Sequence, residues 1–162
     1  MEQKALTIEY KVFKNISELD PTIQNLCEAS EKALATAYAP YSNFNVGTAI
    51  ELEDGKIIKG SNQENVAYPS GLCAERVALF TIGSQFPNAI IKRMAITAQT
   101  KKFQISTPVT SCGSCLQVMA EFEQKQKSSI QVVFYCLGGE VVVVNSVKDL
   151  MPFSFVEDRL GD

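Results

Sequence analysis

Three cysteines and one glutamate are the residues of this chain whose types and spacing could perform chemistry. Cys112 and Cys115 lie three positions apart in the stretch CGSC, so both sulfur atoms would share one face of a helix that begins there. The bare N–H groups and the positive dipole end of such a helix stabilise thiolates. A pair of this kind is either a redox dithiol or part of a metal site, and the pair alone does not decide between the two.

Cys73 supplies a third sulfur in a matching position, because it follows a polar loop and opens the helix-like stretch CAERVALFTIG. Two helix N-termini at one edge of a sheet could aim three sulfurs at one point. Three thiolates leave a zinc ion with one position open for water. Glu75 would then lie in the first helical turn, near the metal but not bound to it, where a carboxylate can take a proton from water and pass it on.

The absence of histidine from the 162 residues narrows the chemistry further. It excludes Ser-His-Asp and Cys-His nucleophiles, and any zinc must be held by Cys, Asp or Glu. The cysteine count is odd, and the N-terminus lacks the apolar segment of a signal peptide, so we expect a reducing, cytoplasmic setting. Cys27 and Cys136 fall within apolar patterns and are expected in the core.

The elements that must position these residues alternate between strands and helices, which is typical of a single α/β domain. Asp20 and Pro21 suit the start of a helix, and Asp54-Gly55 suits a hairpin turn. The expected elements are a strand at 5–13, a helix at 21–37, a hairpin at 45–62, a helix at 73–83, a strand at 93–99, a helix at 112–126 and a hairpin at 130–146. We therefore predict a mixed sheet of about five strands covered by helices, with a possible extra N-terminal strand.

Charge and hydropathy exclude two classes of partner. The net charge is −3 and no block of Lys and Arg occurs, which disfavours nucleic acid. No run of about 18 apolar residues occurs, so no membrane span is expected.

The order CAER then CGSC resembles the zinc-dependent cytidine deaminases of the three-cysteine, homotetrameric type. The stretches AYAPYSNFNVG, GSNQENVAY and LMPFSF resemble further motifs of that family, and the resemblance extends from about residue 30 to 160. It implies a three-layer cytidine-deaminase-like fold in a single domain over 1–162. Residues 1–25 would be an N-terminal extension, and 150–162 a tail that contributes to a neighbouring subunit's site.

The resemblance also implies an activity, which is the hydrolysis of cytidine and deoxycytidine to uridine and deoxyuridine with release of ammonia, as in pyrimidine salvage. One Zn²⁺ per chain would be held by Cys73, Cys112 and Cys115, its hydroxide would attack the base, and Glu75 would shuttle the proton. The partner would be a free nucleoside, and the assembly a cytoplasmic homotetramer with shared active sites.

Seven further residues match positions that bind substrate or adjust the metal in the resembled family. Asn62 and Glu64 match ribose contacts, Phe44 an aromatic beside the base, and Ala74 a backbone contact to the base. Phe155 matches a tail aromatic that enters a neighbouring subunit's site. Arg76 and Gln117 match residues that surround the ligand sulfurs, where hydrogen bonds offset the charge of three thiolates.

Two positions depart from the resembled pattern, and other functions stay open. Ser111 stands where proline is usual before the first cysteine of the pair, and Leu116 where arginine often follows the second. A thioredoxin-like oxidoreductase would explain CGSC but leave Cys73 and Glu75 unused. A structural zinc module would need Cys27 or Cys136 as a fourth ligand. Within the deaminases, a blasticidin-type or nucleic-acid substrate is the alternative.

Overall fold

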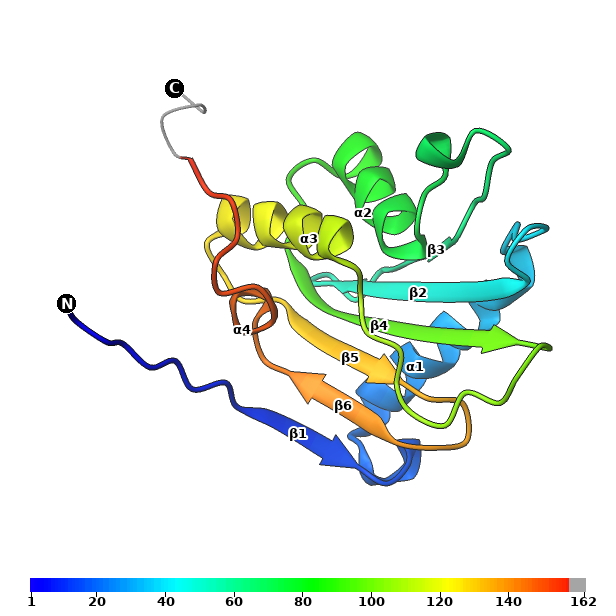
Figure 1. Ribbon diagram of the computed structural model, residues 1–162, viewed down its shortest axis with the longest axis horizontal. Coiled ribbons are helices and arrows are strands. Elements are labelled where there is room, and N and C mark those ends of the chain that lie inside the picture. The colour runs from blue at the N-terminus through cyan, green and yellow to red at the C-terminus, as the bar shows by residue number, and fades with distance from the viewer. Residues whose placement is uncertain (158–162) are drawn as a thin grey trace.

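A six-stranded mixed sheet forms the centre of the computed structural model, which describes residues 1–157 (Figure 1). Its strands run in the order β1-β6-β5-β4-β2-β3, and every neighbouring pair is antiparallel except β4 and β5. The strands are β1 (Tyr10–Phe13), β2 (Phe44–Leu52), β3 (Ile57–Ser61), β4 (Ile91–Thr100), β5 (Gln131–Tyr135) and β6 (Val141–Val144). The predicted mixed α/β sheet is therefore confirmed.

Helices cover both faces of the sheet and make three layers (Figure 1). The helices are α1 (Pro21–Ala33), α2 (Ala74–Gln85), α3 (Gly113–Gln126) and α4 (Val147–Leu150). Alternate residues of β4 belong to opposite faces of the sheet. Met94 and Ile96 pack with α2, α3 and α4, whereas Ala95 packs with α1. Two apolar clusters, one on each face, thus form the core.

Two helix ends differ from the sequence prediction. The first helix begins as expected, with the Asp20 carboxylate accepting from the Thr22 N–H at 2.9 Å, but it tightens into a 3₁₀ turn over Leu34–Thr36. The second was expected to end at Gly83, yet α2 continues to Gln85. A glycine costs a helix only about 1 kcal/mol, and burial of the preceding Ile82 outweighs that cost.

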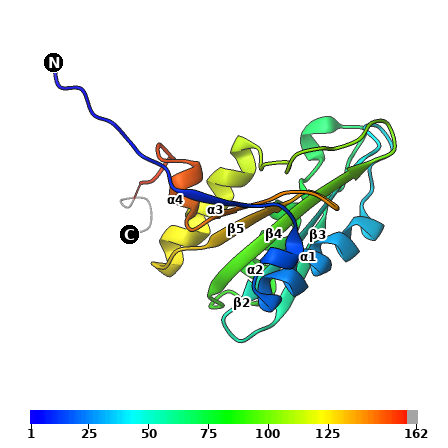
Figure 2. The ribbon, with the colours of Figure 1, turned by 90° about the horizontal axis from the view of Figure 1, so that it is seen from below.

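The extra N-terminal strand is present as β1, which pairs with β6 at the sheet edge. It covers only Tyr10–Phe13 of the expected 5–13, because β6 is itself only four residues long. The residues before β1 extend away from the sheet in both views (Figure 2).

The connections around α2 and α3 bring their N-termini to one edge of the sheet. Strands β3 and β4 are both antiparallel to β2, so they are parallel to each other, and α2 joins them. In the same way α3 joins the parallel pair β4 and β5. Both helices therefore begin beyond the ends of parallel strands, as the sequence pattern predicted.

Candidate metal centre and substrate cavity

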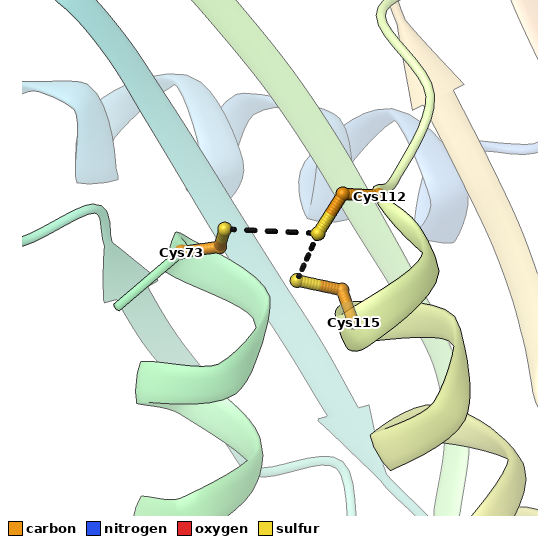
Figure 3. A group of neighbouring side chains, drawn as sticks. All are labelled: Cys73, Cys112 and Cys115. Atoms are coloured by element: carbon orange, nitrogen blue, oxygen red, sulfur yellow. Dashed lines mark hydrogen bonds between the residues drawn. The ribbon is translucent and has the colours of Figure 1, made fainter. Parts of the chain in front are cut away.

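Three thiols converge at the N-termini of α2 and α3 (Figure 3). Cys73 is the N-cap of α2, Cys112 is the N-cap of α3, and Cys115 lies in the first turn of α3. The Sγ atom of Cys112 lies 3.9 Å from that of Cys73 and 3.5 Å from that of Cys115, and all three sulfurs lie within 4.8 Å of one another. Sulfurs around a tetrahedral zinc at about 2.3 Å stand ~3.8 Å apart, so this group has the spacing that zinc requires.

Close packing of α2 on β3 sets the position of Cys73. Gly60 of β3 faces the start of α2, and a Cβ atom at this position would lie 2.7 Å from the Ala78 nitrogen and still closer to the Ala74 carbonyl oxygen. Only glycine permits this approach of helix to strand. The sheet thereby holds the first turn of α2 against α3.

The electrostatics around Cys73 favour a thiolate. A hydrogen bond from the Cys115 thiol, aided by the Arg76 guanidinium, lowers the pKa of Cys73 to about 6 although burial opposes the shift. The same interaction with Cys73, together with burial, raises the pKa of Cys115. The Arg76 Nη2 atom lies 3.8 Å from the Cys73 sulfur. One anionic sulfur beside two further thiols and a cation is a donor set suited to a thiophilic metal ion.

Glu75 is the buried carboxyl group of this site. Only 4% of the residue is exposed, and it lines the same cavity as Cys73 and Cys112. Its place in the first turn of α2 is favoured by the helix dipole. A carboxylate held at the cavity wall beside the thiols can exchange protons with a bound molecule.

A cavity of about 780 Å³ extends from the thiols to the loops that flank β2 and β3. Cys73, Glu75, Arg76 and Cys112 lie at one end. The other lining residues include Tyr41, Ser42, Phe44, Val46, Asn62, Glu64, Asn65, Tyr68, Val109 and Thr110. This size and mixture of aromatic and polar groups suit a small organic ligand.

Asn62 and Glu64 line this cavity and also hold the turn that leads into β2. The Asn62 carboxamide accepts from the Val46 N–H at 2.8 Å and donates to the Phe44 carbonyl at 2.9 Å. The Glu64 carboxylate accepts from the Tyr41 N–H at 2.9 Å and from both the N–H and the hydroxyl of Ser42. Although burial opposes it, the Ser42 hydroxyl and these N–H groups lower the pKa of Glu64.

Besides Cys115, three expected site residues lie outside the cavity lining. Ala74 is fully buried against β3. Phe155 is 70% exposed, and its backbone N–H and carbonyl are bound by the Gln117 carboxamide at 2.9 and 2.7 Å. Gln117 thus contacts the tail. The roles expected for Ala74 and Phe155 in binding substrate, and for Gln117 near the sulfurs, stay predictions.

The two remaining cysteines do not join the thiol cluster. Cys27 lies in the core on the opposite face of the sheet, where burial raises its pKa to about 12. The Cys136 thiol donates to the Ile105 carbonyl at 3.5 Å. Neither can be a fourth ligand, which removes the structural zinc module. The approach of Cys73 to the CGSC pair also makes a self-contained dithiol the weaker interpretation.

Aromatic residues of two loops were missed by the sequence analysis. Tyr41 and Tyr68 both line the cavity, and their rings meet edge to face with centroids 5.9 Å apart. The only signal was their place within two quoted motifs, Tyr41 in AYAPYSNFNVG and Tyr68 in GSNQENVAY, which also contains Asn62 and Glu64. Ser111 lies beside the thiol cluster, and its hydroxyl is buried without a hydrogen-bond partner among residues 1–157.

No helix within residues 1–157 is long and apolar enough to span a membrane.

Comparisons with known proteins agree with this geometry. Residues 21–131 match the family model of the cytidine and deoxycytidylate deaminase zinc-binding region. The chain is 36% identical over 139 residues to a cytidine deaminase of Halalkalibacterium halodurans, and the alignment covers 86% of this chain and 98% of that protein. It is 38% identical to one from Sporosarcina psychrophila, with 86% and 95% covered. The crystal structure of cytidine deaminase from Burkholderia pseudomallei superposes with a TM-score of 0.70 at 39% identity, over 81% of this chain and 97% of that one.

Proposed function

The chain belongs to the zinc-binding cytidine and deoxycytidylate deaminase family, and from that membership we propose that it hydrolyses free cytidine and deoxycytidine. The products would be uridine or deoxyuridine and ammonia. The observation that carries the proposal is a cluster of three thiols, two of which line the same cavity as the buried carboxyl group of Glu75.

Cys73, Cys112 and Cys115 would hold the zinc ion, one per chain. When bound there, zinc supplies the Lewis acidity that makes a water molecule nucleophilic near neutral pH. Arg76 offsets the negative charge that three thiolates would place beside the reacting base, since its guanidinium already donates to the Cys73 sulfur.

Glu75 would carry the protons of the reaction. As water adds to C4 of the base, Glu75 accepts a proton from it and gives that proton to ring nitrogen N3. Glu75 then moves the second proton of the water to the exocyclic amine, the C4–N bond breaks, and ammonia leaves while C4 keeps the oxygen. Burial beside the thiols supports this role, because it keeps the carboxyl group within the cavity and away from bulk water.

The far end of the cavity supports a nucleoside as the substrate. A carboxylate has about four acceptor sites and an amide has two N–H donors. Glu64 uses three acceptor sites on the turn at Tyr41 and Ser42, and Asn62 uses one N–H on the Phe44 carbonyl. Each therefore has capacity left for a sugar hydroxyl, and Phe44 can pack beside the base.

We also propose that the enzyme is a cytoplasmic homotetramer with shared active sites. Free thiols at the metal centre require a reducing compartment. Phe153 and Phe155 of the tail are 92% and 70% exposed, as expected of residues that a second subunit covers.

Substitution of the proton carrier tests the activity. Purified Glu75→Gln should bind as much zinc as the wild type and lose at least about a hundredfold in kcat, because general acid–base catalysis commonly contributes that much. Glu53→Gln, on the exposed hairpin turn, is the matched control and should be fully active. Ammonia release from cytidine, deoxycytidine, cytosine, adenosine and blasticidin S separates the substrate classes. Substantial activity in Glu75→Gln would disprove the mechanism.

A further inference from the structure

The segment 101–111 between β4 and α3 has no part in the function described so far, yet it borders the cavity. Its start is fixed by the Lys102 N–H, which donates to the Thr100 hydroxyl at 3.2 Å. Its middle is fixed by the Cys136 thiol, which donates to the Ile105 carbonyl. Near its end, Val109 and Thr110 line the cavity. The segment is therefore a wall that is anchored at its start and in its middle and borders the cavity near its end.

Phe103 connects this wall to the residue expected beside the base. Its ring lies against that of Phe44, with centroids 6.3 Å apart and a tilt of 32°. Phe103 is 59% exposed, so it contributes little to the core, and Phe44 is its aromatic partner. Since Phe44 lines the cavity and begins β2, a ring on its outer side limits the positions that Phe44 can adopt.

We propose that segment 101–111 is the outer wall of the nucleoside site and that Phe103 is a positioning residue that acts through Phe44. The wall would set the affinity for the nucleoside through the residue beside its base and leave the chemistry at C4 unchanged. This inference rests on the proposed function for its choice of ligand.

Steady-state kinetics with cytidine test the part played by Phe103. Phe103→Ala should raise KM roughly three- to tenfold, the range of one aromatic pair, with kcat and zinc content within about twofold of wild type. Phe103→Tyr should restore KM. Tyr10→Ala is the control, because Tyr10 is equally exposed but lies on β1 at the opposite edge of the sheet. An unchanged KM in Phe103→Ala, or an equal rise in Tyr10→Ala, overturns the inference.

A double-mutant cycle shows whether Phe103 acts through Phe44. In a Phe44→Ala background, Phe103→Ala should add less than about twofold to KM, because the contact is already lost. Full additivity would contradict the inference.

A readout that does not need turnover keeps this inference separate from the proposed function. Trypsin cleaves after Lys101 and Lys102, and loss of the Phe103–Phe44 contact should speed that cleavage in both Phe103→Ala and Phe44→Ala. If the wild type deaminates no nucleoside, the proposed function fails while faster cleavage still supports the anchored wall. If cleavage is unchanged in both variants, the wall is not anchored and this inference fails alone.

Discussion

Gly60→Ala is the substitution that most directly tests how the fold positions the active site. Gly60 lies in β3 beneath the first turn of α2, and the added Cβ atom would meet the Ala74 carbonyl oxygen and the nitrogen and Cβ atoms of Ala78. Two of these contacts would be 2.7 and 2.9 Å, and none involves the far end of a flexible side chain. Relief therefore requires that α2 itself move.

The size of that movement follows from the distances. Ordinary contact begins at 3.4 Å, so α2 must retreat by about 0.7 Å at Ala78 and by more at Ala74. Ala74 lies between Cys73 and Glu75, so both would be displaced from α3. Overpacking of this kind costs about 1–3 kcal/mol. A misplacement near 1 Å reduces the rate by about a hundredfold.

Parallel measurement of kcat, bound zinc and Tm separates loss of geometry from loss of stability. Gly47→Ala is the matched control, since its Cβ atom would strike the Ser30 carbonyl and the Leu34 nitrogen of the α1 layer on the opposite face. It should lower Tm at least as much but leave kcat of the folded protein nearly unchanged. In Gly113→Ala the added Cβ atom would have no heavy atom within 4 Å, so this variant should lower neither Tm nor kcat. Retention of kcat within about threefold in Gly60→Ala would refute the reasoning.

Three further predictions concern stability, thiols and the tail. Glu123→Ala should lower the free energy of unfolding by about 2–4 kcal/mol, measured by urea denaturation, because this carboxylate accepts from three backbone N–H groups and a serine hydroxyl that join α3 to β5 and α4. Chelation of zinc should make Cys73 and Cys112 reactive toward Ellman's reagent in the folded protein, whereas Cys115 and Cys27 should stay protected, because both are fully buried and burial helps to raise their pKa values. Gln117→Ala should make the tail after Leu150 more sensitive to proteolysis, since it removes both hydrogen bonds to Phe155, whereas Gln117→Glu keeps the acceptor and should be intermediate.

The thiol cluster could be predicted from the sequence because each step depended on a local signal. A polar loop before Cys73 and another before Cys112 mark two helix starts, and alternation of strands with helices predicts which edge those starts share. The absence of histidine then limited the possible metal ligands to Cys, Asp and Glu. The structure confirms the convergence of the three sulfurs that these signals predicted.

The cavity wall could not be predicted, because its contacts join segments that have no common pattern. Phe103 lies in a connection without periodicity, and nothing in its neighbours indicates that it meets Phe44. The Tyr41–Tyr68 pair likewise depends on the paths of two loops. The end of α2 at Gln85 instead of Gly83 has the same origin, since burial of Ile82 is a tertiary effect that outweighs local propensity.

Asn62 and Glu64, which we propose bind the sugar, show how a turn former can also be available to a substrate. If these side chains were free to rotate, nucleoside binding would have to order them, at a cost of about 1–2 kcal/mol each in rotamer entropy. Here the hydrogen bonds to Phe44, Val46, Tyr41 and Ser42 fix both side chains before any ligand arrives. The remaining donor of the amide and acceptor of the carboxylate are thereby preorganised. The structural and the functional interpretations of these two residues are therefore not alternatives, because the first makes the second possible.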